Sequence, residues 1–473
     1  MTESFDFVVI GSGPAGEKAA AQASYFGKRV AIVERSPAPG GAAVSHAGVP
    51  TKTFREAALY MTGFRHREVY GLSLELTQEV VLERLRSRTE EIVETMTEAV
   101  RLNIARHGIE LVHGEGRLGP DRTVIVRGTD GTERVLEAEA VLIATGSRPL
   151  RPTLVPFEDP DVYDSERILF MSRIPESMVV VGGGAVACEY ASILNALGTR
   201  ITLVDPGPRL LPVFDAELSE ALVDVFQREA IEVRLEERLA SILREGDRLA
   251  VTFGGGDVLH VEAFLFAAGR IGNTENLGLE EADVKVDGRG RILVDSNFRT
   301  GAEGIYAAGD VIGPPALASV SMEQGRVAAC DAFDIPFKET VDSVAPFGVY
   351  SIPEVAMVGL TEHAAAGLGI EVETGRWLFA HNTRAVIAGS TQGMLKLVFR
   401  RDDRRLLGVH ILGELASELI HQGQLVLHHE GTIDHFIHTT YNVPTWSEAY
   451  KYAAYNGLQR LSGRVGAAHL GRG

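Results

Sequence analysis

Short apolar runs alternate along the chain with stretches of small residues at helical spacing. An apolar run at 5–10 leads into Gly11-Ser-Gly-Pro-Ala-Gly16, a small-residue stretch to Phe26 and a second apolar run at 29–33. Runs of this length next to glycine predict buried strands, and the small-residue stretch predicts a helix. The opening of the chain is therefore predicted to be a strand, a tight turn, a helix and a strand.

The same order returns in the middle of the chain. An apolar run at 178–181 leads into Gly182-Gly-Gly-Ala-Val-Ala187, a helix to Leu197 and a strand at 200–204. Both copies close on an acid, Glu34 in the first and Asp205 in the second. Two such units in one chain predict two nucleotide-binding domains of the Rossmann type.

The residue types in each turn suit a dinucleotide. The first glycine permits a tight turn, the second lets a pyrophosphate approach the backbone, and the third small residue lets the helix pack on the strand. The closing acid accepts hydrogen bonds from a ribose. Glycine turns also occur without nucleotides, but here the strands, helix and acid are all in place. The predicted contacts are Gly11, Gly13, Gly16 and Glu34 in the first copy and Gly182, Gly184, Ala187 and Asp205 in the second.

Further strands and helices are predicted around the two copies. Apolar runs at 141–145, 264–270 and 305–308 resemble short strands that end at glycine, and the charged stretch 79–107 is predicted to be a solvated amphipathic helix. From about Pro346 the pattern changes to strands at 393–400 and 406–413, followed by helices. The chain is therefore expected to be an α/β protein with a third, α+β domain.

Composition narrows the class of protein. A chain of 473 residues is too long for a single hydrophobic core. Its net charge of −18 argues against nucleic acid as a partner. Cys188 and Cys330 are far apart in small or apolar contexts, which favours buried thiols in a reducing compartment. No signal-like segment and no apolar run of spanning length is found, so we expect a cytoplasmic protein without a membrane partner.

The aromatic and histidine residues of the last third are expected to be structural. Trp377 and Trp446 are expected to pack in the third domain or at a dimer contact. No carboxylate spacing accompanies the histidines of the C-terminal helices, so no metal site is predicted there. These histidines are His421, His428, His429, His435 and His438.

With these motifs placed, the chain resembles the two-dinucleotide-binding flavoprotein disulfide reductase superfamily over nearly its whole length. Within that superfamily it is similar to the soluble pyridine nucleotide transhydrogenase family. The matched superfamily signals are the two glycine turns with Glu34 and Asp205, Ala144-Thr145-Gly146, and Ala308-Gly309-Asp310. The segments similar to the transhydrogenases are 313–319, 350–355 and 439–445, the last followed by Glu448-Ala-Tyr450.

The resemblance implies the domain organisation and the cofactors. FAD is expected in a Rossmann-like domain formed by 1–150 and 276–345, and NAD(H) or NADP(H) in a second one at 151–275. The α+β domain at 346–473 is expected to form a homodimer, with the aromatic segment 441–455 closing the flavin site of the neighbouring subunit.

The resemblance also implies individual roles. Lys52 is expected beside flavin N5 and Glu189 as its ion-pair partner, and these two are the expected catalytic residues. Asp310 is expected to hold the ribitol, and a helix starting near Ala316 to point its amides at the flavin. The other expected cofactor contacts are Thr145, Gly146, Gly269, Arg270, Gly309 and Ala318.

The departures from the superfamily concern its thiol chemistry. The two cysteine positions read Ala43 and Gly48, and the position of the C-terminal histidine base reads Val443, although Glu448 is retained. Neither Ala43 nor Gly48 can form a thiolate, so electrons cannot pass to a disulfide substrate. Ala185 replaces a tyrosine that often gates the nicotinamide pocket.

The expected function is therefore transfer of hydride between NADPH or NADH and NAD⁺ or NADP⁺ through flavin, without a dithiol relay. A diaphorase that passes electrons to a quinone, a dye or oxygen is an alternative, and it would need an exposed flavin face near 44–46. A non-catalytic flavoprotein is a third, but Lys52, Glu189 and the second glycine turn count against it.

Nucleotide choice is predicted from two residues. Asp205 should repel a 2′-phosphate and favour NAD(H), whereas Arg209 could offset that repulsion.

Overall fold

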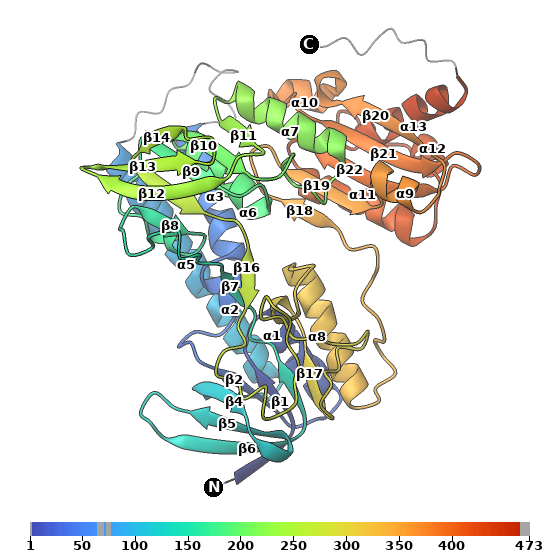
Figure 1. The fold of residues 1–473 in the computed structure, drawn as a ribbon. Coiled ribbons are helices and arrows are strands. Elements are labelled where there is room, and N and C mark those ends of the chain that lie inside the picture. Colours follow the sequence, from blue (N-terminus) through green and yellow to red (C-terminus); the bar gives the residue numbers. More distant parts are fainter. Residues whose placement is uncertain (1, 64–70, 72–76, 464–473) are drawn as a thin grey trace. The chain divides into compact units, whose positions relative to one another are not determined.

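The computed structural model describes residues 2–63, 71 and 77–463 (Figure 1). The chain divides into two compact units, and each is assembled from discontinuous segments. Unit 1 consists of Met1–Phe54, Glu83–Leu150 and Gly269–Asp342, and unit 2 consists of Arg55–Leu82, Arg151–Ala268 and Ser343–Gly473.

Unit 1 is built on a seven-stranded sheet. The central strands are parallel. β1 (Thr2–Ile10) pairs with β2 (Val30–Glu34) on one side and with β6 (Glu133–Ile143) on the other. β3 (Glu110–His113) pairs with β2, and β17 (Ile305–Ala307) pairs with β6. β4 (Glu115–Leu118) and β5 (Thr123–Arg127) extend it in antiparallel fashion. Every residue of β2 is buried, as expected for a parallel strand covered on both faces.

Small residues bring two helices of unit 1 close together. A Cβ on Gly325 of α8 (Ala318–Ala332) would lie 2.2 Å from the carbonyl oxygen of Ala15 in α1 (Pro14–Tyr25), so only glycine fits there. The helix expected near Ala316 begins at Ala318 because Leu317 has extended backbone angles. The other helices with residues in unit 1 are α2 (Gly41–Ser45), α3 (Gly48–Thr62) and α5 (Gln78–Arg106), the last being the predicted charged helix.

The first part of unit 2 has a parallel sheet in the order β11-β10-β9-β15-β8. The strands are β8 (Val162–Asp164), β9 (Ser177–Val181), β10 (Arg200–Asp205), β11 (Glu232–Leu235) and β15 (Ala263–Phe266). α6 (Ala185–Ala196) follows β9, α7 (Ala216–Arg228) follows β10, and an antiparallel sheet is formed by β12 (Leu239–Glu245), β13 (Arg248–Phe253) and β14 (Val258–Val261).

The second part of unit 2 has an antiparallel sheet in the order β18-β19-β22-β21-β20. Its strands are β18 (Phe347–Val349), β19 (Val355–Gly359), β20 (Val372–Leu378), β21 (Met394–Arg400) and β22 (Leu406–Leu412). The helices are α9 (Glu362–Gly367), α10 (Thr383–Ala388), α11 (Ala416–His428), α12 (Asp434–His438) and α13 (Glu448–Leu461). The α/β fold with an additional α+β domain is therefore confirmed.

The aromatic residues of 441–455 divide between the core and the surface. Trp446 and Tyr450 are buried in the core of the C-terminal sheet, so Trp446 packs within the third domain, which is one of the two places expected for it. Tyr450 lies on the inward face of α13, while Tyr452 and Tyr455 of the same helix remain exposed. Trp377 stacks on Tyr452 within the same domain.

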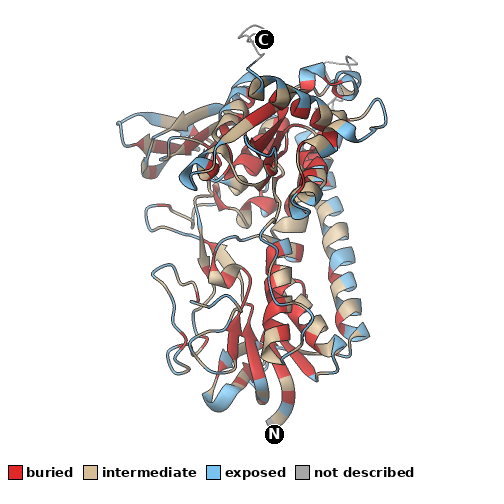
Figure 2. Cartoon of the chain, turned by 90° about the vertical axis from the view of Figure 1, so that its right-hand side faces the viewer, coloured by how far each residue is buried: buried red, intermediate tan, exposed pale blue. Residues whose placement is uncertain are grey.

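Buried residues gather on the sheets of both units, and exposed residues lie on loops and outer helix faces (Figure 2). Among the described residues, no helix combines the length and apolarity needed to cross a membrane.

Candidate nucleotide-binding sites

The first glycine turn begins where β1 ends. Gly11 has φ +106°, its N–H donates to the carbonyl oxygen of Val33 at 2.8 Å, and a Cβ here would lie 2.4 Å from the carbonyl oxygen of Ala144. A Cβ on Gly16 would lie 1.9 Å from the carbonyl oxygen of Gly11. Both positions therefore require glycine, and the turn presses directly against the start of α1.

Gly13 differs from these two glycines because its surroundings are open. It is the N-cap of α1, and a Cβ on it would have Gly41 Cα, at 3.9 Å, as its nearest neighbour. The N-terminus of a helix with free amides and open space beside it suits a phosphate group. The residues present therefore fit a pyrophosphate at this turn.

Glu34 is held beside the same turn. Its Oε2 accepts hydrogen bonds from the Ser12 N–H at 3.0 Å and from the Ser12 hydroxyl at 2.5 Å, and its Oε1 accepts from the Ser36 N–H at 2.8 Å. The side chain is buried. The carboxylate at the end of β2 is thereby fixed next to the glycine turn.

Asp310 lies in a polar group at the end of β17. Its Oδ2 accepts from the Ser147 hydroxyl at 2.9 Å, and that hydroxyl accepts from Arg270 Nε at 2.8 Å. Gly309 has φ +83°, and its N–H donates to the buried Gln324 side chain at 2.8 Å. The sequence reasoning missed Ser147 and Gln324. The sequence did contain a signal for Ser147. It follows Gly146 directly, just as Arg270, an expected cofactor contact, follows Gly269.

Thr145, Gly146 and Asn273 tie together the two segments where the chain passes between units. The Thr145 hydroxyl donates to the Asn273 carbonyl oxygen at 2.7 Å, and the Asn273 N–H donates to the Gly146 carbonyl oxygen at 3.0 Å. Just beyond, β7 (Ser147–Pro149) pairs antiparallel with β16 (Arg270–Gly272). These hydrogen bonds of Thr145 and Gly146 join two segments of the chain to each other.

The backbone at the two vacated cysteine positions keeps them close. Ala43 lies in α2 and Gly48 begins α3. A Cβ on Gly48 would lie 3.2 Å from the Ala43 carbonyl oxygen and 3.7 Å from Ala43 Cα, so the two positions are close neighbours. Lys52 follows on α3, where its Nζ donates to the Thr51 hydroxyl at 3.3 Å.

The second glycine turn repeats the first in unit 2. Gly182 has φ +134°, its N–H donates to the carbonyl oxygen of Val204 at 2.9 Å, and a Cβ here would lie 2.7 Å from the carbonyl oxygen of Ala267. A Cβ on Gly184, the N-cap of α6, would meet nothing within 4 Å. Ala187 fills the third position and is fully buried. This turn also leaves room for a phosphate at a helix N-terminus.

Asp205 and Arg209 follow the second turn. The Asp205 Oδ1 accepts from the Gly207 N–H at 2.7 Å, and a Cβ on Gly183 would lie 2.7 Å from Asp205 Cγ. Arg209 is half-buried on the next loop, where its Nη2 donates to the Pro212 carbonyl oxygen at 3.0 Å. Asp205, also half-buried, is packed against the glycine turn.

Glu189 is buried in α6 and faces a segment of the C-terminal domain. Its Oε1 accepts from the Tyr350 N–H at 2.9 Å, and one turn later the Ser192 hydroxyl accepts from the Ile352 N–H at 2.9 Å. Glu189 belongs to unit 2, whereas Lys52 belongs to unit 1. The structure therefore describes the two expected catalytic residues within separate units.

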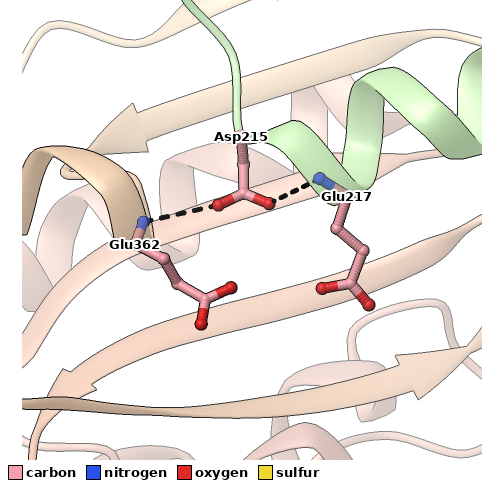
Figure 3. A group of neighbouring side chains, drawn as sticks. All are labelled: Asp215, Glu217 and Glu362. Atoms are coloured by element: carbon pink, nitrogen blue, oxygen red, sulfur yellow. Dashed lines mark hydrogen bonds between the residues drawn. The ribbon is translucent and has the colours of Figure 1, made fainter.

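A group of charges around a buried lysine in unit 2 was not foreseen from the sequence. The carboxylates of Asp215, Glu217 and Glu362 lie within 4.8 Å of one another (Figure 3). Lys396, fully buried, forms ion pairs with all three. Its ammonium takes the central position that a metal ion would need, so the carboxylates neutralise a lysine. No spacing along the chain could have revealed the group, because Glu362 and Lys396 lie far in sequence from Asp215 and Glu217.

The matching family models cover most of the chain. Residues 5–325 match the model described as pyridine nucleotide-disulphide oxidoreductase, and residues 345–454 match its dimerisation domain. A protein of Mycobacterium tuberculosis (strain ATCC 25177 / H37Ra) named soluble pyridine nucleotide transhydrogenase is 41% identical, over 97% of this chain and 98% of its own length. One of the same name from Marinomonas sp. (strain MWYL1) is 38% identical, over 97% and 99%.

Solved structures have the same fold. The crystal structure of LpdA from Mycobacterium tuberculosis matches with a TM-score of 0.87 at 26% identity, covering 95% of this chain and 99% of that one. The Cu(II) complex of the flavoprotein disulfide reductase RclA from Escherichia coli has a TM-score of 0.86 at 24% identity, over 96% of this chain and 99% of that chain, which shows the fold alone. The chain belongs to the pyridine nucleotide-disulphide oxidoreductase family, and it does so without the cysteine pair of the disulfide reductases.

Proposed function

We propose that the chain is an FAD-dependent NAD(P)⁺ transhydrogenase. One observation carries the proposal: both dinucleotide turns are intact, whereas the thiol positions are Ala43 and Gly48. Hydride exchange between two nicotinamide nucleotides needs both nucleotide sites but no thiol, acid or base. The relatives named soluble pyridine nucleotide transhydrogenase support this activity.

Unit 1 is assigned to FAD, which supplies the ring that accepts and returns hydride when bound. Gly13 and the N-terminus of α1 would receive the pyrophosphate, and Glu34 would bind the adenosine ribose. Asp310, oriented by Ser147, would bind the ribitol. Lys52 would place a cation near the ring and stabilise negative charge there.

Unit 2 is assigned to the nicotinamide nucleotide. Gly184 and the N-terminus of α6 would receive its pyrophosphate, and Asp205 its adenosine ribose. Glu189 is proposed as a catalytic residue, and its hydrogen bond from the Tyr350 N–H fixes its carboxylate. The reduced and the oxidised nucleotide would use this site in turn.

The other parts of the proposal follow from the family. FAD would occupy 1–150 and 276–345, the nicotinamide nucleotide 151–275, and 346–473 would form the homodimer. Tyr452 and Tyr455, exposed on α13, supply aromatic surface of the kind found at such interfaces. Cys188 and Cys330 are buried thiols, in keeping with the reducing cytoplasm.

A steady-state assay tests the function. The purified holoenzyme is mixed with NADPH and thio-NAD⁺, and reduction of thio-NAD⁺ is followed by its own absorbance. Parallel reactions replace thio-NAD⁺ with a quinone or with oxygen. We expect the nucleotide to be the fastest acceptor. If a quinone or oxygen is reduced far faster, the enzyme is a diaphorase, and if no acceptor is reduced the chain is a non-catalytic flavoprotein.

A further inference from the structure

The loop 350–354 joins β18 to β19 and is hydrogen-bonded to α6. The two strands pair with each other directly on either side of it, so strand pairing holds only the ends of the loop. The Tyr350 N–H donates to Glu189 Oε1 at 2.9 Å. Two residues later, the Ile352 N–H donates to the Ser192 hydroxyl at 2.9 Å. Two side chains of α6, one turn apart, therefore bind alternate N–H groups of the loop.

These contacts close a ring of hydrogen bonds around Glu189. The carboxylate accepts from Tyr350 at one end of the ring. At the other end, the Ser192 hydroxyl accepts from Ile352 and donates back to the carbonyl oxygens of Cys188 and Glu189, at 2.9 and 3.0 Å. Both Glu189 and Ser192 are buried. The position of the carboxylate therefore depends on where the loop lies against α6.

Arg55 holds the same loop from the opposite direction. Its side chain is buried, and its Nε donates to the Ser351 carbonyl oxygen at 3.2 Å. That carbonyl and the Ile352 N–H belong to one planar trans peptide group, in which they point in opposite directions. The peptide group is thus bound at its oxygen by Arg55 and at its N–H by Ser192. Arg55, the loop and α6 all belong to unit 2.

A second buried residue of the loop orients the Arg55 guanidinium. Nη2 of Arg55 lies 3.2 Å from Glu354 Oε1, and both side chains are buried. The other carboxylate oxygen of Glu354 accepts from the N–H and the hydroxyl of Ser417, at 3.1 and 2.6 Å. A buried ion pair is weak evidence for stability, because desolvation offsets much of its attraction. Here the pair fixes the guanidinium with its Nε toward the Ser351 carbonyl oxygen.

We propose that Arg55 and Ser192 are positioning residues for Glu189, because they hold from two sides the loop whose Tyr350 N–H binds its carboxylate. The inference rests on the proposed function, in which Glu189 is a catalytic residue of the nicotinamide nucleotide site. Release of either contact frees the peptide group between Ser351 and Ile352, and it loosens the ring that fixes the carboxylate.

The two contacts should affect hydride transfer more than nucleotide binding. The pyrophosphate and the adenosine ribose are assigned to Gly184 and Asp205, which lie outside the ring. A small displacement of a group that orients the reacting ring lowers the rate of the chemical step. NADPH and NADH carry the same nicotinamide, so both should react more slowly by the same factor.

Ser192→Ala is the first test, since it removes only the hydroxyl that accepts the Ile352 N–H. In the FAD-loaded enzyme we expect the limiting rate of flavin reduction by NADPH and by NADH to fall about tenfold, with either KM changed less than about twofold. Anaerobic stopped-flow absorbance measures the rate. Arg55→Met, which removes the contact on the other side of the peptide, should lower the same rate.

Each variant has a matched control in unit 2. Thr361→Ala removes a hydroxyl that accepts the Ala364 N–H at 3.1 Å, at the start of α9. Arg376→Met removes an arginine that forms an ion pair with Glu217. Both controls should lower the melting temperature and leave the limiting rate of flavin reduction unchanged.

A Glu189→Ala background shows whether the effect passes through Glu189. Ser192→Ala should cause no further loss of rate in that background. The inference is overturned if Ser192→Ala lowers the melting temperature but not the rate, or if it lowers the rate by the same factor with and without Glu189. If Arg55→Met does not fold, Ser192→Ala and its background test decide alone. If wild-type flavin is reduced by neither NADPH nor NADH, the proposed function fails and this inference fails with it.

Discussion

The two glycine turns have the same backbone conformation but differ in the third small residue and in the hydrogen bonds of the closing acid. In both, a first glycine of positive φ lies against a neighbouring carbonyl oxygen and the next helix starts at an open glycine. In the first turn Gly16 admits no methyl group and Glu34 is bonded to the turn itself through Ser12. In the second turn Ala187 carries a methyl group and Asp205 is bonded to the outgoing loop through Gly207.

The difference suits two kinds of ligand. An acid bonded to the turn belongs to a closed site, as a resident cofactor requires. An acid bonded to the loop that leaves the strand suits a nucleotide that must enter and leave in each turnover. Substitutions in and around the two turns test this contrast.

Gly16→Ala should prevent assembly of the first site. Its new Cβ would lie 1.9 Å from the Gly11 carbonyl oxygen, and overpacking of that kind costs about 3 kcal/mol or more. We expect a colourless or insoluble protein, measured by the ratio of flavin to protein absorbance and by thermal unfolding. Ala187→Gly is the matched change in the second turn, expected to cost about 1 kcal/mol and to keep the flavin. A yellow Gly16→Ala enzyme of normal stability would contradict the closed design of the first turn.

Asp310→Ala should loosen FAD without unfolding unit 1. The carboxylate would lose a charge-assisted hydrogen bond to the cofactor, worth about 1.5–3 kcal/mol, or roughly a tenfold to hundredfold rise in the dissociation constant. Flavin release on dilution or ultrafiltration measures it. Asp205→Ala is the comparison in unit 2 and should keep its full flavin content. Equal flavin loss in the two variants would mean that the units do not divide the cofactors as proposed.

Arg209→Ala should affect NADP(H) selectively. Wild type is expected to have the lower KM for NAD(H), because Asp205 repels a 2′-phosphate and a single arginine recovers only part of that cost. Removal of Arg209 should raise the KM for NADPH about tenfold and that for NADH less than about twofold. Asp205→Ala should reduce the preference for NAD(H). A wild-type preference for NADPH, or equal effects of Arg209→Ala on both nucleotides, would refute this description of the loop.

Cysteines introduced at positions 43 and 48 should form a disulfide bond but should not confer disulfide reductase activity. In the Ala43→Cys/Gly48→Cys variant, the closeness of the two backbones should allow a disulfide, which thiol titration before and after reduction would detect. No NADH-dependent reduction of lipoamide or glutathione disulfide is expected, because Val443 stands at the position of the base. The single variant Gly48→Cys is the control. Robust disulfide reductase activity in wild type or in the double variant would show that the missing residues are not required.

The sequence alone determined the two glycine turns and much of their surroundings. Gly11 and Gly182 could be predicted because a tight turn from a parallel strand into a helix needs positive φ, and only glycine adopts it without strain. The fold class followed from the same local patterns and the family from the resemblance of the motifs, and both are confirmed. Roles of Glu34, Lys52, Glu189 and Asp310 toward the cofactors stay predictions.

Tertiary structure alone decided which distant residues meet. Ser147 and Gln324 join Asp310 and Gly309 through hydrogen bonds that no spacing encodes. The sequence left open whether Trp446 packs in the third domain or at a dimer contact, and the fold of the C-terminal domain placed it in the core.

The ion pairs of Lys396 with Asp215, Glu217 and Glu362 show most clearly what could not be predicted from the sequence. A lysine in a strand is ordinarily a solvent-facing residue. The charge is tolerated inside because Asp215, Glu217 and Glu362 arrive from two helix N-termini elsewhere in the chain. Local pattern determines backbone conformation through short-range sterics, whereas the partner of a buried charge depends on how the whole chain folds back on itself.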